Sequence, residues 1–477
     1  MRGRKRLTIS LCAIAIFVPT GRAQSKNETN QLAREILKQL IEINTTDSVG
    51  NVTTAAEAMA KRLRDAGFSE KDVIVAGPNE RKKNLVARFH GTGKHKPALF
   101  IGHLDVVEAR REDWTTDPFQ FIEKDGYFYG RGTQDMKEGD AILVANFIRL
   151  KREGFQPDRD LILALTADEE GGNYNGIEWL VKHHRDWIDA EYCINLDGLA
   201  ESQKGRASLF SIDVSEKVYA DFTLETTNPG GHSSVPRHDN AIYSLAAALA
   251  RLQAFSFPLK LNEVTRKYLE YSAQKAVGQR SADLMAVTKI PPDPQAVERL
   301  SEDPNYNSVL RTTCVATMLS GGHAPNALPQ AARANVNCRI FPGEEPEEVR
   351  HTLARVIADP QARVRFVEQH AADGSVIVPV SVPPSPLNGE LLSAVEKIVT
   401  RMWPGVPVIP DMSQGASDST YLRIGGMPAY VFSGVFLDSD DVRAHGRDER
   451  VRASSFYEGV EFNYQLIREL ASEPQNR

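Results

Sequence analysis

The chain has 477 residues, 41% hydrophobic and 25% charged, a composition that excludes a disordered, collagen-like or disulfide-scaffold protein and allows more than one domain. Its net charge is -6, and without residues 1–23 it is -11, because five of the 57 Lys and Arg residues lie there and none of the 63 Asp and Glu residues does. An acidic chain binds polyanions poorly, so we expect no nucleic-acid partner.

Residues 1–23 have the pattern of a cleaved secretory signal peptide. A basic start is followed by an apolar run over 7–18, and the small residues Gly21 and Ala23 precede a cleavage site before Gln24. The apolar run is shorter than the roughly 20 residues that span a bilayer, so we favour cleavage over the alternative, an uncleaved anchor. The sequence therefore predicts export to the periplasm or the extracellular space, with no stable membrane anchor after cleavage.

Cleavage would remove Cys12 and leave three cysteines, so at most one disulfide can form within the chain. Cys314 and Cys338 lie in two strand-like runs, and a bridge between neighbouring strands is one interpretation. Three buried free thiols, Cys193 included, are the alternative.

The first half of the chain has the pattern of an α/β sheet. Amphipathic helices are predicted over 31–43 and 55–68, and apolar runs then alternate with helix-like segments. Three of these runs, over 98–102, 161–167 and 190–196, resemble buried strands, and each is followed at once by acids or a histidine. Because open α/β sheets place ligand sites beyond the C-terminal ends of their strands, the three runs are predicted to converge on one site.

The pattern changes near residue 217 and predicts a separate two-layer α+β unit. Its expected strands and helices are a strand over 217–226, a helix over 239–253, strands over 311–319 and 332–341, a helix over 345–359 and a strand over 364–369. The polar stretch from Phe257 to Asn307 receives no assignment. A Pro-rich linker over 378–389 then leads to a helix over 390–403 and a last sheet segment over 428–434, so the smaller unit is predicted to be an insertion.

His103 and Asp105 lie two residues apart at a predicted strand end, where a carboxylate can hold an imidazole and select the nitrogen that meets a metal. Taken alone, the pair is more typical of a core histidine with a carboxylate partner. Asp135 lies between the Gly-rich segment 129–134 and a predicted helix, in a tight loop where backbone can approach an ion. A helix N-cap is the alternative for Asp135.

Glu169 and Glu170 are adjacent after an apolar strand, where neighbouring side chains point in opposite directions. One carboxylate can therefore bind a metal while the other faces the substrate as general base; an exposed acidic turn is the alternative. Asp197 repeats the carboxylate at a strand end. His445 follows an acidic loop and by itself is typical of a surface histidine.

Together these residues fit a metal site better than each does alone. Two histidines and several carboxylates suit zinc or a similar divalent ion, and two ions that share one bridging carboxylate need one histidine and one terminal acid each. That count is supplied by His103, Asp135, Asp197, Glu170 and His445.

Six segments carry a resemblance to a known family: HLDVV, WTTDPF, YGRGTQDMK, ADEEGG, GGHSSVP and AHGRDERV. They resemble, in the same order, the zinc-dependent metallopeptidase family of glutamate carboxypeptidase, aminoacylase, carboxypeptidase S and succinyl-diaminopimelate desuccinylase. The resemblance implies a three-layer αβα catalytic domain over 24–215 and 377–477, with an inserted two-layer α+β lid and dimerisation domain over 216–376. It also implies a homodimer.

The resemblance implies that Asp135 bridges two Zn²⁺ ions, or Co²⁺ or Mn²⁺ in their place. His103 and Asp197 would complete one site, and Glu170 and His445 the other. Many relatives have Glu where this chain has Asp197, which shortens the reach of that ligand. The sequence KEG also replaces the commoner KGG after Asp135.

The same resemblance implies roles in catalysis and substrate binding. Asp105 would orient His103, and Glu169 would be the general base for hydroxide attack on the amide. His232 would polarise the scissile carbonyl across the subunit boundary, although its segment by itself is only a turn.

Asn326 and Arg339 match positions in the family that hold the substrate, and a guanidinium group pairs well with a C-terminal carboxylate. A salt bridge on a strand face is the alternative for Arg339.

We therefore expect an exported di-zinc metallopeptidase for small peptides with a free C-terminal carboxylate. An N-acyl-amino-acid amidohydrolase is the alternative within the enzyme class. A catalytically silent binding homologue is the alternative from another class, because fold does not ensure activity; the intact Glu169 argues against it.

Overall fold

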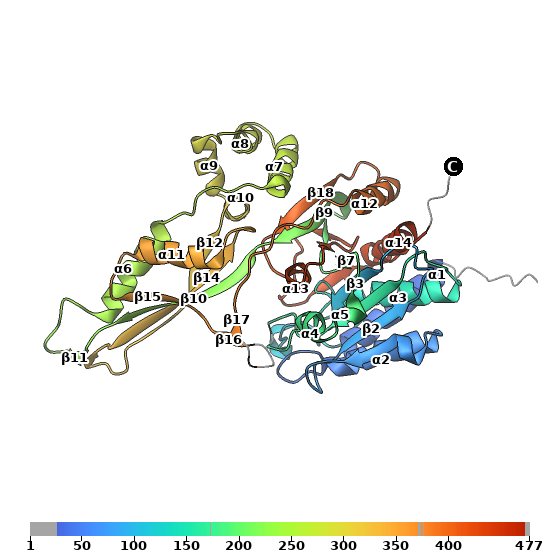
Figure 1. The fold of residues 1–477 in the computed structure, drawn as a ribbon, viewed down its shortest axis with the longest axis horizontal. Helices are drawn as coiled ribbons and strands as arrows, with labels where there is room; N and C mark the ends of the chain where they lie inside the picture. The colour runs from blue at the N-terminus through green and yellow to red at the C-terminus, as the bar shows by residue number, and fades with distance from the viewer. Residues whose placement is uncertain (1–25, 172, 371–373, 375, 473–477) are drawn as a thin grey trace, which may run out of the picture.

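The computed structural model describes residues 26–171, 173–370, 374 and 376–472. Figure 1 shows two parts, one built on a large sheet and a long arm that projects from it, which we define as residues 218–366. The expected signal peptide and Cys12 lie outside the described residues.

The large sheet is mixed and has ten strands in the order β1-β2-β6-β3-β7-β19-β9-β8-β20, with β18 paired to β9. Its centre is parallel, because β3 pairs in parallel with both β6 and β7, and β7 with β19. The strands are β1 Val73–Ala76, β2 Asn84–Phe89, β3 Ala98–His103, β6 Leu161–Thr166, β7 Tyr192–Asn195, β8 Ala200–Gln203, β9 Arg206–Glu216, β18 Val408–Ser413, β19 Ala429–Val431 and β20 Phe436–Asp438.

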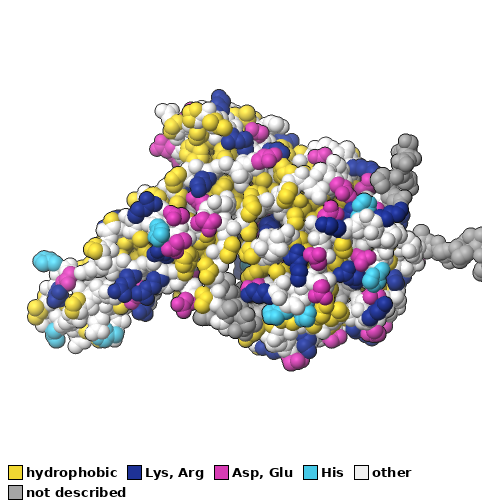
Figure 2. Space-filling view, viewed as in Figure 1, with side chains coloured by type: hydrophobic (Ala, Val, Ile, Leu, Met, Phe, Trp, Pro, Cys, Tyr) yellow, Lys and Arg dark blue, Asp and Glu magenta, His cyan; other side chains and the backbone are white. Residues whose placement is uncertain are grey.

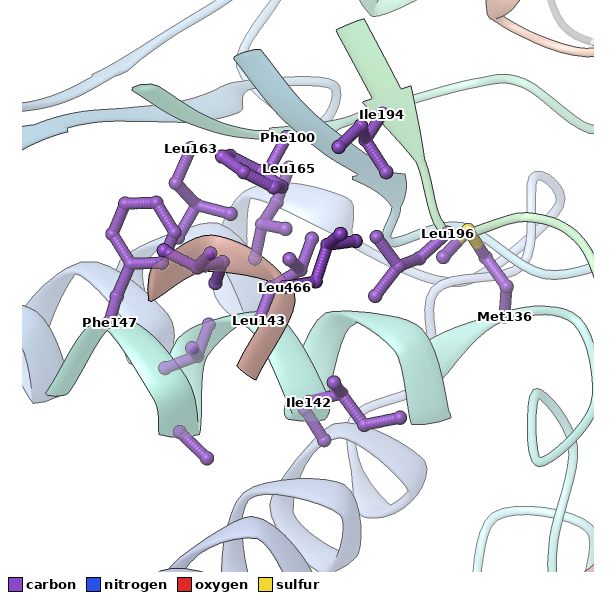
Figure 3. Close-up of a cluster of buried hydrophobic side chains, with 14 of the residues drawn as sticks. Phe100, Met136, Ile142, Leu143, Phe147, Leu163, Leu165, Ile194, Leu196 and Leu466 are labelled. Carbon is purple, nitrogen blue, oxygen red and sulfur yellow. The ribbon is translucent and has the colours of Figure 1, made fainter. Parts of the chain in front are cut away.

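Helices cover both faces of this sheet, which makes three layers. They are α1 Lys26–Glu42, α2 Val52–Asp65, α3 Lys137–Arg152, α4 Gly176–His183, α5 Arg185–Ile188, α12 Gly389–Met402, α13 Ser419–Ile424 and α14 Ala453–Leu470. Helices α4, α5 and α13 share one core with one face of the sheet, and the remaining five share a larger core with the other face. Figure 3 shows Phe147 and Leu143 of α3 beside Phe100 and Leu163 of the sheet. The predicted α/β class is confirmed.

The arm contains a four-stranded antiparallel sheet in the order β12-β14-β10-β15, with α6 and α11 packed on one face. The elements are β10 Val218–Thr227, α6 Ala241–Ala254, β12 Thr313–Gly321, β14 Ala331–Ile340, α11 Pro346–Ile357 and β15 Ala362–Phe366. Burial alternates along β14, so that one set of its side chains enters the core and the other lines an open polar face. The chain returns to the large sheet through β18, β19 and β20.

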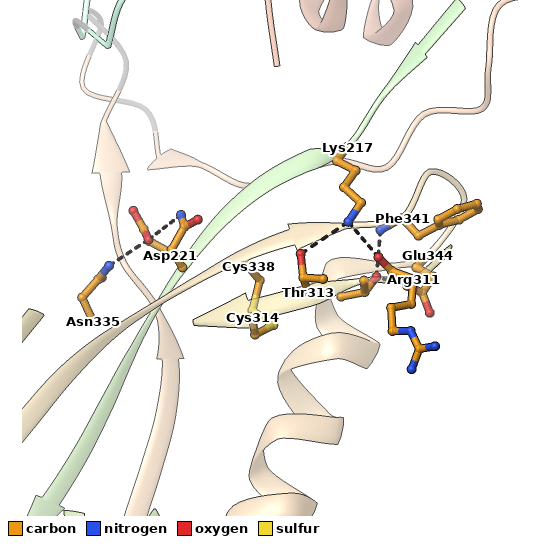
Figure 4. The surroundings of a disulfide bond; sticks show 11 residues. Lys217, Asp221, Arg311, Thr313, Cys314, Asn335, Cys338, Phe341 and Glu344 are labelled. Atoms are coloured by element: carbon orange, nitrogen blue, oxygen red, sulfur yellow. Dashed lines mark hydrogen bonds between the residues drawn. A yellow bond between two sulfur atoms is a disulfide. The ribbon is translucent and has the colours of Figure 1, made fainter. Parts of the chain in front are cut away.

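Cys314 of β12 and Cys338 of β14 are directly opposite each other and form a disulfide (Figure 4). Cys193 is a buried free thiol in the core of the large sheet. Of the two interpretations of the cysteines, the bridge between strands is therefore the correct one.

The stretch without a sequence assignment, 257–307, is largely helical. Its helices are α7 Glu263–Lys275, α8 Gln279–Val287, α9 Pro294–Ser301 and α10 Pro304–Leu310, which share a small apolar core. Helix α7 also packs against β18. Asparagine or aspartate caps the N-termini of α7, α9 and α10, so the polar residues that obscured the pattern are the ones that begin the helices.

Short elements complete the described chain. They are β4 Ile122–Lys124, β5 Tyr127–Tyr129, β21 Arg450–Arg452, β11 Gly231–His232, β13 Ala327–Leu328, β16 Gln369–His370, β17 Val376–Ile377, η1 Glu70–Asp72 and η2 Arg111–Asp113. Figure 2 shows basic and acidic side chains interspersed over the face of the large-sheet part. Among the described residues, no helix combines the length and the apolar character needed to cross a bilayer.

Candidate metal centre

Three neighbouring parallel strands deliver acids and a histidine to one edge of the large sheet. In the register, His103 at the end of β3 lies opposite Thr166 at the end of β6, and Ile101 lies opposite Asn195 at the end of β7. The chain segments that follow these strands therefore leave the sheet side by side. This is the convergence that the three apolar runs predicted.

One group of ligand-competent side chains consists of His103, Asp135 and Asp197, whose ligand atoms lie within 4.8 Å of one another. Nε2 of His103 lies 3.1 Å from Oδ1 of Asp135 and 3.9 Å from Oδ1 of Asp197. Nδ1 of His103 lies 3.1 Å from the backbone carbonyl oxygen of Asp105, which selects Nδ1 as the protonated nitrogen and leaves Nε2 for a ligand.

The second group consists of Asp135, Glu170 and His445, again within 4.8 Å. Nε2 of His445 lies 2.9 Å from Oδ2 of Asp135 and 3.0 Å from Oε2 of Glu170. Asp135 thus presents one oxygen to each group, as a bridging carboxylate must. All five residues expected to bind metal are brought together.

The charges of the site fit divalent cations. Burial raises the pKa of Asp197 well above its ordinary value, and also that of Glu169. Hydrogen bonds to Asp135 and Glu170 raise the pKa of His445 to about 10. The Oε1 atom of Glu170 is buried without a hydrogen-bond partner among the described residues. A divalent cation is a suitable partner for carboxylates and imidazoles gathered this closely.

Asp105 acts differently from the expectation for its carboxylate. The carboxylate accepts hydrogen bonds from the backbone N–H groups of Glu169 at 3.2 Å and Glu170 at 3.1 Å. It lies 3.8 Å from Nδ1 of His103, within ion-pair range but beyond hydrogen-bond distance, and the hydrogen bond to that ring comes from the backbone carbonyl of Asp105. The reason is that β3 ends at His103, so Asp105 has left the strand and faces the turn after β6.

Sequence reasoning assigned no role to several buried polar residues that support the site. Asp418 accepts hydrogen bonds from Thr166 and Asn175, and so ties the end of β6 to the start of α4. Lys82 pairs with Asp168 beside the two glutamates. No spacing in the sequence brings these partners together, because they lie far apart in the chain.

Gln134 and Glu449 were also missed, although each lies inside a motif noted above: YGRGTQDMK and AHGRDERV. Both side chains are buried and connect the two segments to each other. The sequence offered only the place of both residues inside these motifs; the burial of Glu449, which calls for a partner, is visible only in the structure.

The three residues expected from the arm lie elsewhere. His232 is exposed on β11, and the backbone N–H of Ser233 donates a hydrogen bond to the carbonyl of Asn326 at 3.1 Å. Figure 1 places β11 at the far end of the arm, away from β3 and β7. Arg339 lies on the open face of the arm sheet, with its guanidinium 4.8 Å from the ring of Tyr219. Within one chain, none of the three joins the metal centre.

Comparisons with known proteins identify the family of the chain. The model of "Peptidase family M20/M25/M40" matches residues 99–469. Human N-fatty-acyl-amino acid synthase/hydrolase PM20D1 is 26% identical over 464 residues, which cover 94% of this chain and 89% of that protein. A probable carboxypeptidase S-like 2 from Dictyostelium discoideum is 28% identical over 81% of this chain and 74% of its own length.

Solved structures share the fold. An M20 family metallo-carboxypeptidase from Sulfolobus solfataricus superposes with a TM-score of 0.68 at 16% identity, covering 91% of this chain and 98% of that one. Human carnosine dipeptidase 1 superposes with a TM-score of 0.61 at 17% identity, covering 93% and 98%.

Proposed function

The chain belongs to peptidase family M20/M25/M40, and from this premise we propose that it is an exported di-zinc enzyme for small peptides with a free C-terminal carboxylate. Hydrolysis of amide bonds, by a metallopeptidase or an amidohydrolase, follows from the family and its relatives. The observation that carries the finer proposal is the pair of ligand groups that share Asp135.

The donor set supports two ions of the zinc type. Each group offers one imidazole nitrogen and two carboxylates, a combination that zinc, cobalt and manganese accept. His103 and Asp197 would hold one ion, Glu170 and His445 the other, and Asp135 both. When bound, the ions supply Lewis acidity, which lowers the pKa of water and polarises a carbonyl oxygen.

Glu169 is the proposed general base. Its backbone N–H is held by Asp105 together with that of Glu170, so the turn that presents both carboxylates is fixed. Glu169 accepts a proton from the attacking water and returns it to the nitrogen of the leaving amine, which balances the hydrolysis. Asp105 positions this turn and, through its carbonyl, the His103 ring.

The arm would complete the site from a second copy of the chain. In this proposal residues 216–376 form a lid and dimerisation domain, and His232 stabilises the oxyanion of the partner's substrate. Asn326 lies beside His232 and would bind substrate with it, while Arg339 would pair with the terminal carboxylate.

Exposed apolar side chains of the arm support the homodimer. Val315, Met318 and Leu319 on the edge strand β12 are exposed, as are Ile242 and Tyr243 on α6. An edge strand with such side chains is a template for pairing with another copy. Sedimentation velocity of the purified chain tests this, since a monomer at micromolar concentration would contradict the assignment of His232.

Export is supported by the disulfide, because such bonds persist in oxidising compartments. The pattern of residues 1–23 adds to this support. N-terminal sequencing of the mature protein tests it, with Gln24 expected as the first residue.

A second candidate, hydrolysis of N-acyl amino acids, is favoured by the similarity over most of the chain to PM20D1 proteins, which are named N-fatty-acyl-amino acid synthase/hydrolases. Such substrates also end in a free carboxylate, so the proposed role of Arg339 serves both candidates.

The deciding experiment is hydrolysis of dipeptides and N-acyl amino acids by metal-stripped protein, before and after zinc is restored. Zinc-dependent release from dipeptides supports the proposal, and selective release from N-acyl amino acids supports the second candidate. C-terminally amidated dipeptides are the control and should react far more slowly. A folded dimer that binds two zinc ions and hydrolyses none of these substrates would point to the silent homologue.

A further inference from the structure

Two side chains without a role in the reaction, Gln134 and Glu449, join the loop that carries Asp135 to the loop that carries His445. We name these the 131–135 loop and the 441–449 loop. The carboxylate of Glu449 is fully buried and accepts hydrogen bonds from three backbone N–H groups of the first loop. The donors are Gly132 at 3.1 Å, Gln134 at 2.7 Å and Asp135 at 3.2 Å.

The side chain of Gln134 makes the reverse connection. Its Oε1 accepts from the backbone N–H groups of Arg443 at 2.7 Å and Ala444 at 2.9 Å. Its Nε2 donates to the backbone carbonyls of Asp441 at 3.0 Å and Arg450 at 2.7 Å. All four hydrogen bonds that a glutamine amide can make are therefore directed at the 441–449 loop and the residue that follows it.

Arg131 closes the arrangement. Its Nη1 lies 2.6 Å from Oε2 of Glu449, and its Nη2 donates to the carbonyl of Gly446 at 2.8 Å. The guanidinium also lies 5.0 Å from the ring of Trp114. The buried charge of Glu449 is thus paired, which a buried charge requires.

This part of the site needs such support more than the rest does. His103 ends a central strand and Asp197 closely follows another, whereas Asp135 and His445 lie on loops. The side chain of His445 is 56% exposed and its backbone φ is 61°, so little apolar packing holds it.

We propose that Gln134 and Glu449 are positioning residues that form a reciprocal clamp, which sets the separation of Asp135 and His445 and hence the affinity of the second ion. The inference rests on the proposed function, because it requires two bound ions. It predicts an asymmetry. Gln134 holds the residues next to His445, a ligand of one ion only, whereas Glu449 holds the N–H of Asp135, a ligand of both.

The test is calorimetric titration of metal-stripped protein with Zn²⁺ alone, which needs no substrate. The natural chain should bind two ions, and His445→Ala identifies the step that depends on the second group. Gln134→Met keeps the size of the side chain but removes all four hydrogen bonds. It should weaken the same step by about 10- to 100-fold, the usual loss when a residue that supports a metal ligand is changed, and leave the other step within about threefold.

The matched control is Asn463→Leu, which removes a buried amide on α14 that donates to the carbonyls of Ser433 and Gly459 outside the two loops. It should leave both steps unchanged.

Glu449→Gln should weaken the binding of both ions. If Gln134→Met does not fold, Gln134→Glu tests the same prediction. It keeps the accepting oxygen but loses the two hydrogen bonds that the amide donates.

Unchanged binding of both ions by the folded Gln134 variant would overturn the clamp and leave the di-zinc proposal intact. Equal weakening of both steps by this variant would overturn the asymmetry and with it the clamp as proposed. Binding of fewer than two ions by the natural chain would overturn the proposed function, and the clamp with it, so the two failures are distinguishable.

Discussion

The metal centre and the tip of the arm differ in whether a single chain brings the predicted site residues together. At the centre, parallel strands and two connected loops gather five candidate ligand residues into two groups of three that share Asp135, and within each group the ligand atoms lie within 4.8 Å of one another. At the tip, His232 and Asn326 lie beside each other where β11 pairs with β13, and Figure 1 shows β11 far from that centre. Strand topology within a chain is sufficient for the first, whereas the second would act, in the function proposed above, only on the centre of another copy.

The largest expected effect separates catalysis from metal binding at the centre. Glu169→Gln removes the proposed base and keeps its size, so turnover should fall by about 10³-fold while two zinc ions still bind. Steady-state kinetics and calorimetry measure the two quantities. Glu178→Gln on α4 is the control, and its turnover should be close to that of the natural chain. Substantial turnover by the zinc-loaded Glu169 variant would refute the role of the base.

The next effect tests whether the arm acts on a partner's centre. His232→Ala should lower turnover by about 10²-fold without changing metal affinity, since it removes one stabilising donor. His238→Ala in the same exposed segment is the control. Mixing the His232 and Glu169 variants should restore activity, because hybrid dimers contain one intact site. An inactive mixture of exchanging dimers would contradict action across subunits.

Metal removal should affect the two regions unequally. Each ion held at 100 times its Kd stabilises the folded state by about 2.7 kcal/mol, and the proposed ligands all lie in the large-sheet part. Hydrogen exchange with and without zinc should therefore show protection lost near the strand ends of β3, β6 and β7 and unchanged in β10 and β14. Equal loss in the arm sheet would contradict this division.

Loss of the disulfide should affect the arm and leave the metal centre unchanged, the reverse of metal removal. It closes a loop of sequence separation 24 in the arm, and replacing Cys314 and Cys338 by Ala should destabilise the arm by about 3 kcal/mol. Zinc affinity should remain unchanged, because no metal ligand lies in β12 or β14. Denaturant unfolding followed by metal titration measures both, and a loss of zinc binding in the folded variant would be the contrary result.

The smallest effect concerns two acids that face each other outside the metal centre, Asp213 of β9 and Asp411 of β18. Burial raises the pKa of Asp411 from 3.8 to about 7, and raises that of Asp213 as well. The folded state therefore binds more protons than the unfolded chain between these values, and stability falls as pH rises through about 7.

Asp411→Asn removes this dependence. Its Tm should exceed that of the natural chain by about 1–3 °C at pH 8, and the two should be similar at pH 4. Thermal unfolding across this pH range checks it. A difference that is the same at both pH values would show that the carboxyl charge is not the cause.

The sequence by itself determined most of the helices and strands and the candidate ligands that they bring together. Apolar runs such as 161–167 are strands because they bury on both faces, and the acids after them belong to one edge because parallel strands share an edge. The helices of 257–307 escaped prediction, since their apolar residues form a small core of their own among many polar and Pro residues.

Only the tertiary structure decided which partners hold these groups. The contact of Asp105 with the turn at Glu169, the pairing of Cys314 with Cys338, and the links of Gln134 and Glu449 all join residues distant in sequence. Local periodicity carries no information on such pairs, because it records burial and not the identity of the neighbour. Which residue becomes that neighbour depends on how the strands and loops pack, because each buried polar group needs a hydrogen-bond partner there.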